Sequence, residues 1–448
     1  MTKQYGLIVI GAGTAAMGAA MRVRQAGRTV AVIDFRPFGG TCALRGCDPK
    51  KMMINGAHAL DHARRMHGKG VTGEVSIDWP ELMGFKRSFT DPVPEKQERR
   101  YADKGIDTYH GRARFTGPNT LDVEGQSLEA ENILIASGAE PIPLGIPGEE
   151  YLISNEGFLT LEKLPKKIVL VGGGYIAAEF SHLAARAGAE VVVLQHGAQM
   201  LKHFEPELVG WLMASFQEAG IQVHTETQVE AIEKIGEGYR VQASSGGQKL
   251  QFEADCVIHA AGRAPDLDAL NLEAAGVATE GGKLKLNEYL QSVSNPAVYA
   301  AGDAAQMGPP LTPVSSHDAK VVVANLLEGN HRVPNYQGVP SVAFTIPPIA
   351  SVGLSEAQAR EQGLKFNLKS EQASGWFTAR QAAESVYGFK VLVEEGSGRI
   401  LGAHLVGPNV DEVINLFALA IRHGLTADDI KSTMFAYPTG ASDIGYMV

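Results

Sequence analysis

The stretch Tyr5-Gly-Leu-Ile-Val-Ile10-Gly11-Ala-Gly13-Thr-Ala-Ala16 determines how the first part of this chain folds. Its apolar run is typical of a buried strand, and the glycine turn leads into an alanine-rich segment that ends at Gly27. A second apolar run, Thr29 to Ile33, ends at Asp34. The order of strand, glycine turn, helix and strand predicts a βαβ unit with parallel strands.

The turn within this unit has the residues that a dinucleotide site requires. Gly11 can make the tight turn, Gly13 lets the backbone approach a pyrophosphate, and Ala16 is small enough for the helix to pack on the strand. Asp34 lies 21 residues after Gly13, where its carboxylate can accept hydrogen bonds from ribose hydroxyls. We therefore expect a dinucleotide at the N-terminus of this helix.

The same pattern recurs further along the chain. Ile168 to Val171 is the expected strand, Gly172-Gly-Gly174-Tyr-Ile-Ala177 the turn, and Glu190 to Leu194 the second strand. Two such units predict two nucleotide-binding domains.

The two copies differ at the residue that would bind the ribose. Gln195 lies 21 residues after Gly174, so the second site lacks the carboxylate that Asp34 supplies in the first. His196 and Lys202 follow. A carboxylate would repel a 2′-phosphate, whereas neutral and basic groups tolerate or attract it, so NADPH is favoured over NADH. The alternative is that both basic residues are ordinary surface residues.

The composition of the chain limits its class. Its 448 residues are 44% hydrophobic and 20% charged, which predicts several globular domains with a large core. The net charge of -10 disfavours nucleic acid and anionic membrane surfaces as partners. Apolar runs are too short to span a membrane, and the first strand begins too early for a signal peptide. We expect a cytoplasmic protein with neither nucleic acid nor membrane as a partner.

The segment Gly39-Gly-Thr-Cys42-Ala-Leu-Arg-Gly-Cys47-Asp-Pro-Lys-Lys51 suits a small redox-active loop. In a reducing compartment, a close cysteine pair is more often catalytic or metal-binding than structural. Zinc normally takes four ligands, and the third cysteine, Cys256, lies in an apolar run typical of a buried, inert thiol. A redox pair is therefore favoured over half of a zinc site.

This segment resembles the class I pyridine nucleotide-disulfide oxidoreductases, which include glutathione reductase, dihydrolipoamide dehydrogenase and mercuric reductase. Other motifs similar to those of the family follow in the same order: Ala136-Ser-Gly138, Gly172 to Glu179, Val298-Tyr-Ala-Ala-Gly302-Asp303 and Leu311-Thr-Pro313. The resemblance implies an α/β fold with two Rossmann-type dinucleotide-binding domains, for FAD and NAD(P)H, plus a C-terminal α+β dimerisation domain.

Four segments correspond to these domains. Residues 1–148 and 266–335 would form the FAD-binding domain, residues 149–265 the NAD(P)H-binding domain, and residues 336–448 the interface domain. In the last segment we expect strands at Ser341–Phe344, Phe389–Glu394 and Ile400–Val406, and a helix at Val410–His423. Residues 58 to 108 are charged and helical in tendency.

The resemblance also implies roles for individual residues. FAD would lie along Gly11, Gly13, Ala16, Asp34, Gly40, Thr41, Gly138, Gly302 and Asp303. NAD(P)H would lie along Gly172, Gly174, Tyr175, Gln195, His196 and Lys202, with the tyrosine covering the nicotinamide pocket. Cys47 would form the charge-transfer thiolate beside the flavin, and Cys42 would attack the substrate. Lys50 or Lys51 would pair with Glu179. The family builds each active site from two subunits, so a homodimer is expected.

The chain departs from the family at its C-terminus. Disulfide-reducing members carry a catalytic histidine and a nearby acid, but Tyr437 and Ser442 stand at these positions, with Asp443 next along the chain. A phenol with a pKa of about 10 is a poor base at neutral pH. Mercuric reductases also have a tyrosine here. The loop is unusual too, because Arg45 and Asp48 place two charges beside the cysteine pair.

Three functions are consistent with these features. The first is NAD(P)H-dependent reduction of a disulfide or related sulfur substrate, small or protein-bound. The second is reduction of a metal ion, as in mercuric reductase, or of a quinone, with the cysteine pair relaying electrons. The third is a flavin-bearing regulatory protein without catalysis, which the retained Cys42, Cys47, Glu179 and both lysines oppose.

Overall fold

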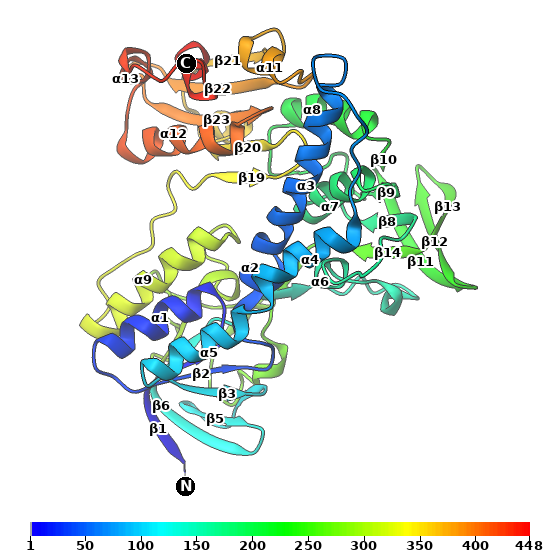
Figure 1. Cartoon of the computed structure of the whole chain (residues 1–448). Helices are drawn as coiled ribbons and strands as arrows, with labels where there is room; N and C mark the ends of the chain where they lie inside the picture. The colour runs from blue at the N-terminus through cyan, green and yellow to red at the C-terminus, as the bar shows by residue number, and fades with distance from the viewer. Residues whose placement is uncertain (1) are drawn as a thin grey trace. The chain divides into compact units, whose positions relative to one another are not determined.

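The first apolar run forms β1 (Lys3–Ile10), a central strand of a seven-stranded sheet. The computed structural model describes residues 2–448 and divides into two compact units (Figure 1). The first unit contains the residues up to Lys50, Phe85–Ile142 and Arg263–Tyr336, and the second contains Lys51–Gly84, Pro143–Gly262 and Gln337–Val448.

The sheet of the first unit is mainly parallel. Its strand order is β3-β2-β1-β6-β5-β4, with β18 paired to β6. The bounds are β2 (Val30–Asp34), β3 (Asp107–His110), β4 (Ala113–Phe115), β5 (Thr120–Val123), β6 (Gln126–Ile135) and β18 (Val298–Ala300). The β4–β5 and β5–β6 pairs are antiparallel, and the other neighbouring strands run parallel. Leu7 to Ile10 are all buried, as expected for a strand covered on both faces.

Helices cover this sheet. α1 (Thr14–Gln25) packs on β1 and β2 and lies beside α9 (Thr312–Glu328) (Figure 1). The expected helical stretch consists of α3 (Cys47–Arg65), α4 (Trp79–Thr90) and α5 (Val93–Asp103), with residues 66–78 irregular. α2 (Gly40–Arg45) precedes α3, and Gly46 separates the two. Short elements complete the unit: β7 (Ala139–Pro141), β15 (Arg263–Pro265), β16 (Thr279–Glu280), β17 (Lys283–Leu284), η2 (Asp268–Leu270) and η3 (Gly302–Ala304).

The second unit contains the second βαβ motif. Its parallel sheet has the order β10-β9-β8-β14, formed by β8 (Lys167–Val171), β9 (Glu190–Leu194), β10 (Gln222–His224) and β14 (Cys256–His259). An antiparallel sheet of β11 (Thr227–Ile235), β12 (Gly238–Ser245) and β13 (Gln248–Ala254) follows β10 in the chain. The helices here are η1 (Glu149–Tyr151), α6 (Asn155–Phe158), α7 (Tyr175–Arg186) and α8 (Pro206–Glu218).

A five-stranded antiparallel sheet forms the C-terminal part of the same unit. Its order is β19-β20-β23-β22-β21, from β19 (Ser341–Ala343), β20 (Ile349–Gly353), β21 (Phe366–Gln372), β22 (Gly388–Glu394) and β23 (Ile400–Val406). Its helices are α10 (Glu356–Glu361), α11 (Phe377–Gln381), α12 (Val410–His423), α13 (Ala427–Ser432), η4 (Gly440–Asp443) and α14 (Ile444–Met447). The predicted helix 410–423 and strand 400–406 are confirmed, and β19 ends one residue earlier than predicted. Within residues 2–448 no helix is long and apolar enough to cross a membrane.

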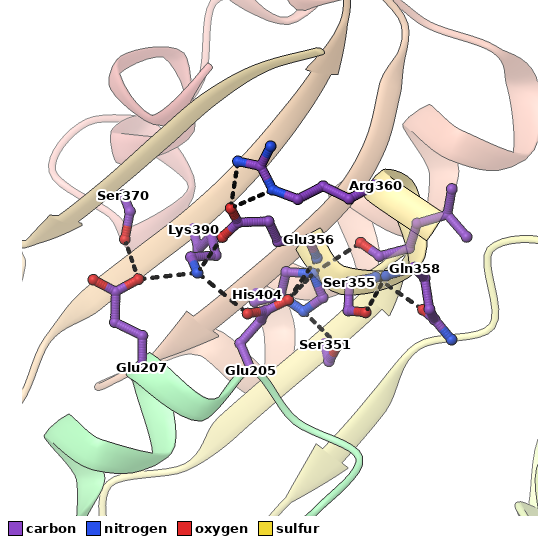
Figure 2. A network of polar contacts seen from close by, with 11 residues as sticks. Glu205, Glu207, Ser351, Ser355, Glu356, Gln358, Arg360, Ser370, Lys390 and His404 are labelled. Carbon is purple, nitrogen blue, oxygen red and sulfur yellow. Dashed lines mark hydrogen bonds and ion pairs between the residues drawn. The ribbon is translucent and has the colours of Figure 1, made fainter. Parts of the chain in front are cut away.

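A buried lysine joins three segments of the second unit (Figure 2). Lys390 Nζ lies 3.2 Å from Glu205, 3.0 Å from Glu207 and 2.8 Å from Glu356. The Lys390 and Glu205 side chains are only 7% and 3% exposed. Glu205 also accepts a hydrogen bond from the backbone N–H of Glu356, at 2.7 Å. This network therefore connects the start of α8 with α10 and β22. Its central charges, on Lys390 and Glu205, are buried and so depend on each other rather than on water.

Replacing Lys390 with methionine should lower the free energy of unfolding by about 3–5 kcal/mol, because Glu205 would remain as a buried, unpaired carboxylate. Urea unfolding followed by circular dichroism measures this. Arg360→Met is the matched control, since Arg360 is 64% exposed and forms its ion pair with Glu356. That variant should cost less than about 1 kcal/mol. If both variants lost the same free energy of unfolding, burial of the ion pair would not determine how much stability its removal costs.

Candidate active site

The dinucleotide turn of the first unit is formed by unusually close backbone contacts. Gly11 has φ +106°, and a Cβ there would lie 2.2 Å from the carbonyl oxygen of Ala136. Gly40 has φ +72°, and a Cβ there would lie 2.3 Å from Cα of Gly13. Only glycine fits these positions. α2, which carries Cys42, is therefore held against the start of α1.

Asp34 lies at the end of β2, beside this turn. Its carboxylate accepts hydrogen bonds from the backbone N–H groups of Ala12, at 2.8 Å, and Arg36, at 2.9 Å. Burial raises the pKa of Asp34 above its ordinary value, although these two N–H groups and the positive charge of Arg45 act in the opposite direction. The charge of Arg45 therefore acts on Asp34. The position of Arg45 in the sequence, beside the cysteines, did not predict this.

A pocket lies next to the same turn. Gly11, Asp34, Phe35, Arg112, Ser137 and Asp266 are among the residues that line it. The Ser137 hydroxyl is buried and has no hydrogen-bond partner. A buried hydroxyl without a partner is costly, so it is a group that a bound ligand can satisfy.

The second motif of the first unit surrounds Asp303. Gly302 N–H donates to Asp318 at 3.0 Å, and Gly138 accepts a backbone hydrogen bond from Asp266 at 3.1 Å. Burial raises the pKa of the Asp303 carboxyl, and the charge of Arg263 lowers it in part.

The two cysteines of the redox loop lie on successive helices and are both thiols. The hydroxyl of Thr312 donates to Cys42 Sγ at 3.1 Å and lies 3.6 Å from Cys47 Sγ. Thr312 is the first residue of α9, whose N-terminus has no side-chain cap. Both sulfurs therefore lie next to a hydroxyl donor at the positive end of a helix, which favours a thiolate.

The pKa of Cys42 is raised above that of an ordinary thiol. The largest cause is the hydrogen bond between the two thiols, followed by burial, and the charge of Asp48 acts in the same direction. The hydrogen bond from Thr312 lowers the pKa of Cys42. The neighbouring thiol and burial together outweigh the effect of Thr312, so Cys42 holds its proton more tightly than an ordinary thiol.

The dinucleotide turn of the second unit has the same backbone register as the first. Gly11 N–H donates to the carbonyl of Ile33 at 2.7 Å, and Gly172 N–H donates to that of Leu194 at 2.8 Å. Asp34 and Gln195, one residue further along, therefore occupy equivalent positions.

Gln195 makes different contacts from Asp34. Its amide donates to the carbonyl of Gln199 at 3.2 Å, and its side chain lies against Gly173. His196 and Lys202 are exposed. The basic groups are therefore accessible, and no carboxylate stands at the end of β9.

Glu179 and Lys51 both contact Phe344 within the second unit. Glu179 is buried on α7 and accepts a hydrogen bond from the backbone N–H of Phe344 at 2.9 Å. Lys51 Nζ lies 3.8 Å from the centre of the Phe344 ring and 3.3 Å from Asp411. On the same helix as Glu179, the ring of Tyr175 packs edge-on against Phe204, and burial raises its pKa.

The C-terminal residues lie in different surroundings. Tyr437 is 79% exposed, with its ring 6.4 Å from that of Phe377. Asp443 accepts a hydrogen bond from the hydroxyl of Tyr387 at 2.8 Å. The hydroxyl of Ser442 donates to the carbonyl of Thr439 at 2.6 Å. Within this unit, Asp443 and Ser442 therefore already have hydrogen-bond partners.

Comparison with known proteins identifies the family. Residues 5–319 match the model described as pyridine nucleotide-disulphide oxidoreductase, and residues 339–448 match that of its dimerisation domain. The chain belongs to this family. Its architecture of two dinucleotide-binding folds and a C-terminal dimerisation domain is thereby confirmed, and so is its class as an FAD-dependent oxidoreductase that uses a pyridine nucleotide.

Similar proteins include enzymes with different substrates. Mercuric reductase of Staphylococcus aureus is 33% identical over 98% of this chain and 81% of its own. Dihydrolipoyl dehydrogenase of Bacillus subtilis is 31% identical over 96% and 93%, and glutathione reductase of Burkholderia cepacia is 32% identical over 98% and 97%. A Cu(II) complex of the HOCl-induced flavoprotein disulfide reductase RclA from Escherichia coli has a TM-score of 0.89 and 26% identity, covering 100% of this chain and 99% of that one.

The residues of the first unit fit FAD. The close approach of Gly13 and Gly40 leaves room for a pyrophosphate at the uncapped start of α1. The pocket beside it offers the Asp34 carboxylate and the unpartnered Ser137 hydroxyl to a ribose or an adenine ring. These are the polar groups that an adenosine moiety needs.

Several residues described above, each within one unit or the other, were not predicted from the sequence. Thr312 was part of a motif but had no role, and Ser137, Phe344 and Asp411 were not singled out as site residues. The Leu311-Thr-Pro313 motif was the available signal for Thr312, since it opens α9. For Phe344 and Asp411 we find no signal, because their contacts depend on chain segments far apart in the sequence.

Replacing Gly40 with alanine should strongly lower the FAD content, since the added Cβ would collide with the backbone of Gly13. The ratio of flavin to protein absorbance in the purified protein measures this. Gly84→Ala is the matched control, because a Cβ on that helical residue meets nothing within 4 Å. A Gly40→Ala protein with full FAD would contradict the assignment of this turn.

Proposed function

We propose that the enzyme passes electrons from NADPH through FAD to the Cys42–Cys47 pair and on to a disulfide or related sulfur substrate, small or protein-bound. The observation that supports this best is the arrangement of both sulfurs around the Thr312 hydroxyl, in the same unit as the FAD cradle. Two thiols that hydrogen-bond to each other are close enough to form a disulfide with a small movement and to reopen it. A cysteine pair that was only structural would not need a hydroxyl donor beside it.

Each residue has a defined task in this proposal. FAD, when bound, accepts a hydride from the nicotinamide and delivers two electrons to the disulfide. The turn at Gly11, Gly13, Gly40 and Thr41 holds the pyrophosphate, while Asp34, Gly138, Gly302 and Asp303 hold the remainder of the cofactor, and Ala16 allows α1 to pack on β1. Cys47 holds the thiolate, and Cys42 attacks the substrate. Lys50 or Lys51 pairs with Glu179, Tyr175 covers the nicotinamide pocket, and Tyr437 stands at the position of the family histidine.

The assembly and location that we propose follow from the family. Residues 1–148 and 266–335 bind FAD, residues 149–265 bind NADPH, and residues 336–448 form the interface of a homodimer. The matched dimerisation domain supports this arrangement. We place the enzyme in the cytoplasm, where a thiol pair is kept reduced.

A second candidate function is the reduction of a metal ion. The mercuric reductase relative and the Cu(II) complex of RclA are the observations that favour it. The tyrosine at position 437 agrees with it, because a metal-ion acceptor has no leaving thiol that needs a proton from a histidine.

A panel of acceptors tests the proposed function. Wild-type enzyme with NADPH should reduce oxidised glutathione, lipoamide or a protein disulfide, and Cys42→Ser should abolish this turnover. Cys42→Ser should still allow NADPH to reduce the flavin, because that step precedes the attack on the substrate. Stopped-flow absorbance separates the two half-reactions. Turnover with mercuric ion, Cu²⁺ or a quinone, but with no disulfide, would favour the second candidate.

Replacing Gln195 with glutamate should shift the coenzyme preference from NADPH toward NADH. The carboxylate would repel the 2′-phosphate and would accept from the ribose hydroxyls, as Asp34 is placed to do. We expect kcat/KM for NADPH to fall by about tenfold or more, equivalent to about 1.4 kcal/mol. A wild-type preference for NADH would instead show that His196 and Lys202 form no phosphate site.

A further inference from the structure

Asp48 lies beside the thiol that attacks the substrate. It is the second residue of α3, and Cys42 Sγ can donate to its Oδ1 across 4.0 Å, the outer range for a thiol donor. On another side, the Thr312 hydroxyl donates to the same sulfur at 3.1 Å. Cys42 therefore has a donor that stabilises its thiolate and a carboxylate that can take its proton. The Asp48 side chain is also accessible to solvent, and so to a substrate.

Thiol–disulfide exchange requires a proton carrier at this point. The attacking thiol must lose its proton, and the leaving thiolate must gain one. Two other candidate groups already have hydrogen-bond partners: Asp443 accepts from the Tyr387 hydroxyl, and His317 accepts from the backbone N–H of Asn335 at 3.0 Å. Tyr437, at the position of the family histidine, is a phenol and a weak base.

We propose that Asp48 is the acid–base of the disulfide reaction and carries the proton from the Cys42 thiol to the leaving thiol. This rests on the proposed disulfide reductase function. It places the proton carrier in the same chain and next to the nucleophile.

The steps balance as follows. The Cys42 S–H bond breaks, its proton moves to Asp48, and Cys42 sulfur bonds to one sulfur of the substrate disulfide. The substrate S–S bond breaks, and the leaving thiolate takes the proton from Asp48. The Cys47 thiolate then attacks Cys42, which forms the enzyme disulfide and releases the second thiolate, to be protonated by solvent. The substrate is reduced by two electrons, and the cysteine pair is oxidised by two.

The electrostatics of the pair suit this role. Burial raises the pKa of Asp48, which makes it a stronger base than an ordinary aspartate. The second thiol, Cys47, is the largest influence on the pKa of Cys42 and raises it, the charge of Asp48 also raises it, and the hydrogen bond from Thr312 lowers it. Cys42 therefore keeps its proton until the reaction begins. The competing role for Asp48 is structural, as an acidic residue in the first turn of α3 that stabilises the helix dipole.

Replacing Asp48 with asparagine distinguishes the effect of its charge from its role in proton transfer. Loss of the charge should make Cys42 more reactive, whereas loss of the proton carrier should slow disulfide exchange. Without the nearby negative charge the pKa of Cys42 falls, so iodoacetamide should alkylate Cys42 of the reduced enzyme severalfold faster at neutral pH. Exchange with an alkyl disulfide should nevertheless slow by about 100-fold, because the proton carrier is missing. With an aromatic disulfide, whose leaving thiol has a low pKa, the loss should be much smaller.

The pH profile gives a further test. In the wild type the rate of exchange should rise through the raised pKa of Asp48, since only the carboxylate accepts a proton. In Asp48→Asn this limb should disappear, and the rate should follow ionisation of the Cys42 thiol at higher pH.

Controls make each outcome decisive. Asp78→Asn changes another carboxylate at a helix start, which accepts from Glu81 N–H at 2.9 Å, and should change neither rate. Faster exchange in Asp48→Asn, or an unchanged rate, would overturn the proposal, as would finding the 100-fold loss in Tyr437→Phe instead. If the wild type reduces flavin and cysteines with NADPH but turns over no disulfide, the proposed function itself fails, and the inference about Asp48 fails with it.

Discussion

The close contact between Gly13 and Gly40 is the constraint on which the rest of the first unit depends. Because neither residue has a side chain, the start of α2 approaches the start of α1 to a distance that a Cβ would forbid. The same contact shapes the phosphate turn and brings the helix with Cys42 to it. Cofactor cradle and redox loop are therefore parts of one backbone arrangement, and α9 completes it by placing Thr312 against both sulfurs.

The elements that were predicted well are those whose signals are local. α1, β9, β23 and α12 have nearly the predicted bounds, because each is an apolar run or an amphipathic segment bounded by glycine or a change in polarity. Equivalence of Asp34 and Gln195 was also predictable, since it depends only on counting from matched glycines. The backbone hydrogen bonds of the two turns confirm that count.

The parts of the site that could not be predicted depend on tertiary contacts. Ser137 is notable only because burial leaves its hydroxyl without a partner. Phe344 is notable because its N–H binds Glu179 and its ring lies under Lys51. In the sequence, Asp48 is a charged residue directly after Cys47. In the structure its carboxylate lies beside Cys42, which is six residues earlier and on α2, before the break at Gly46. Sequence order alone did not indicate which of the two thiols it would affect.

In the second unit, a cluster of buried charges joins two helices, α3 and α7. Asp61 on α3 accepts hydrogen bonds from Arg65, at 2.8 Å, and from Arg186 on α7, at 2.9 Å. Arg186 is 8% exposed, and its guanidinium also lies 2.8 Å from the ring of His182, whose pKa is lowered by burial so that the ring stays neutral. Moving α3 along α7 by one turn would leave a buried arginine without its carboxylate, which costs more than the loss of an exposed pair. A charge cluster of this kind adds little net stability, but it permits only one register of the two helices.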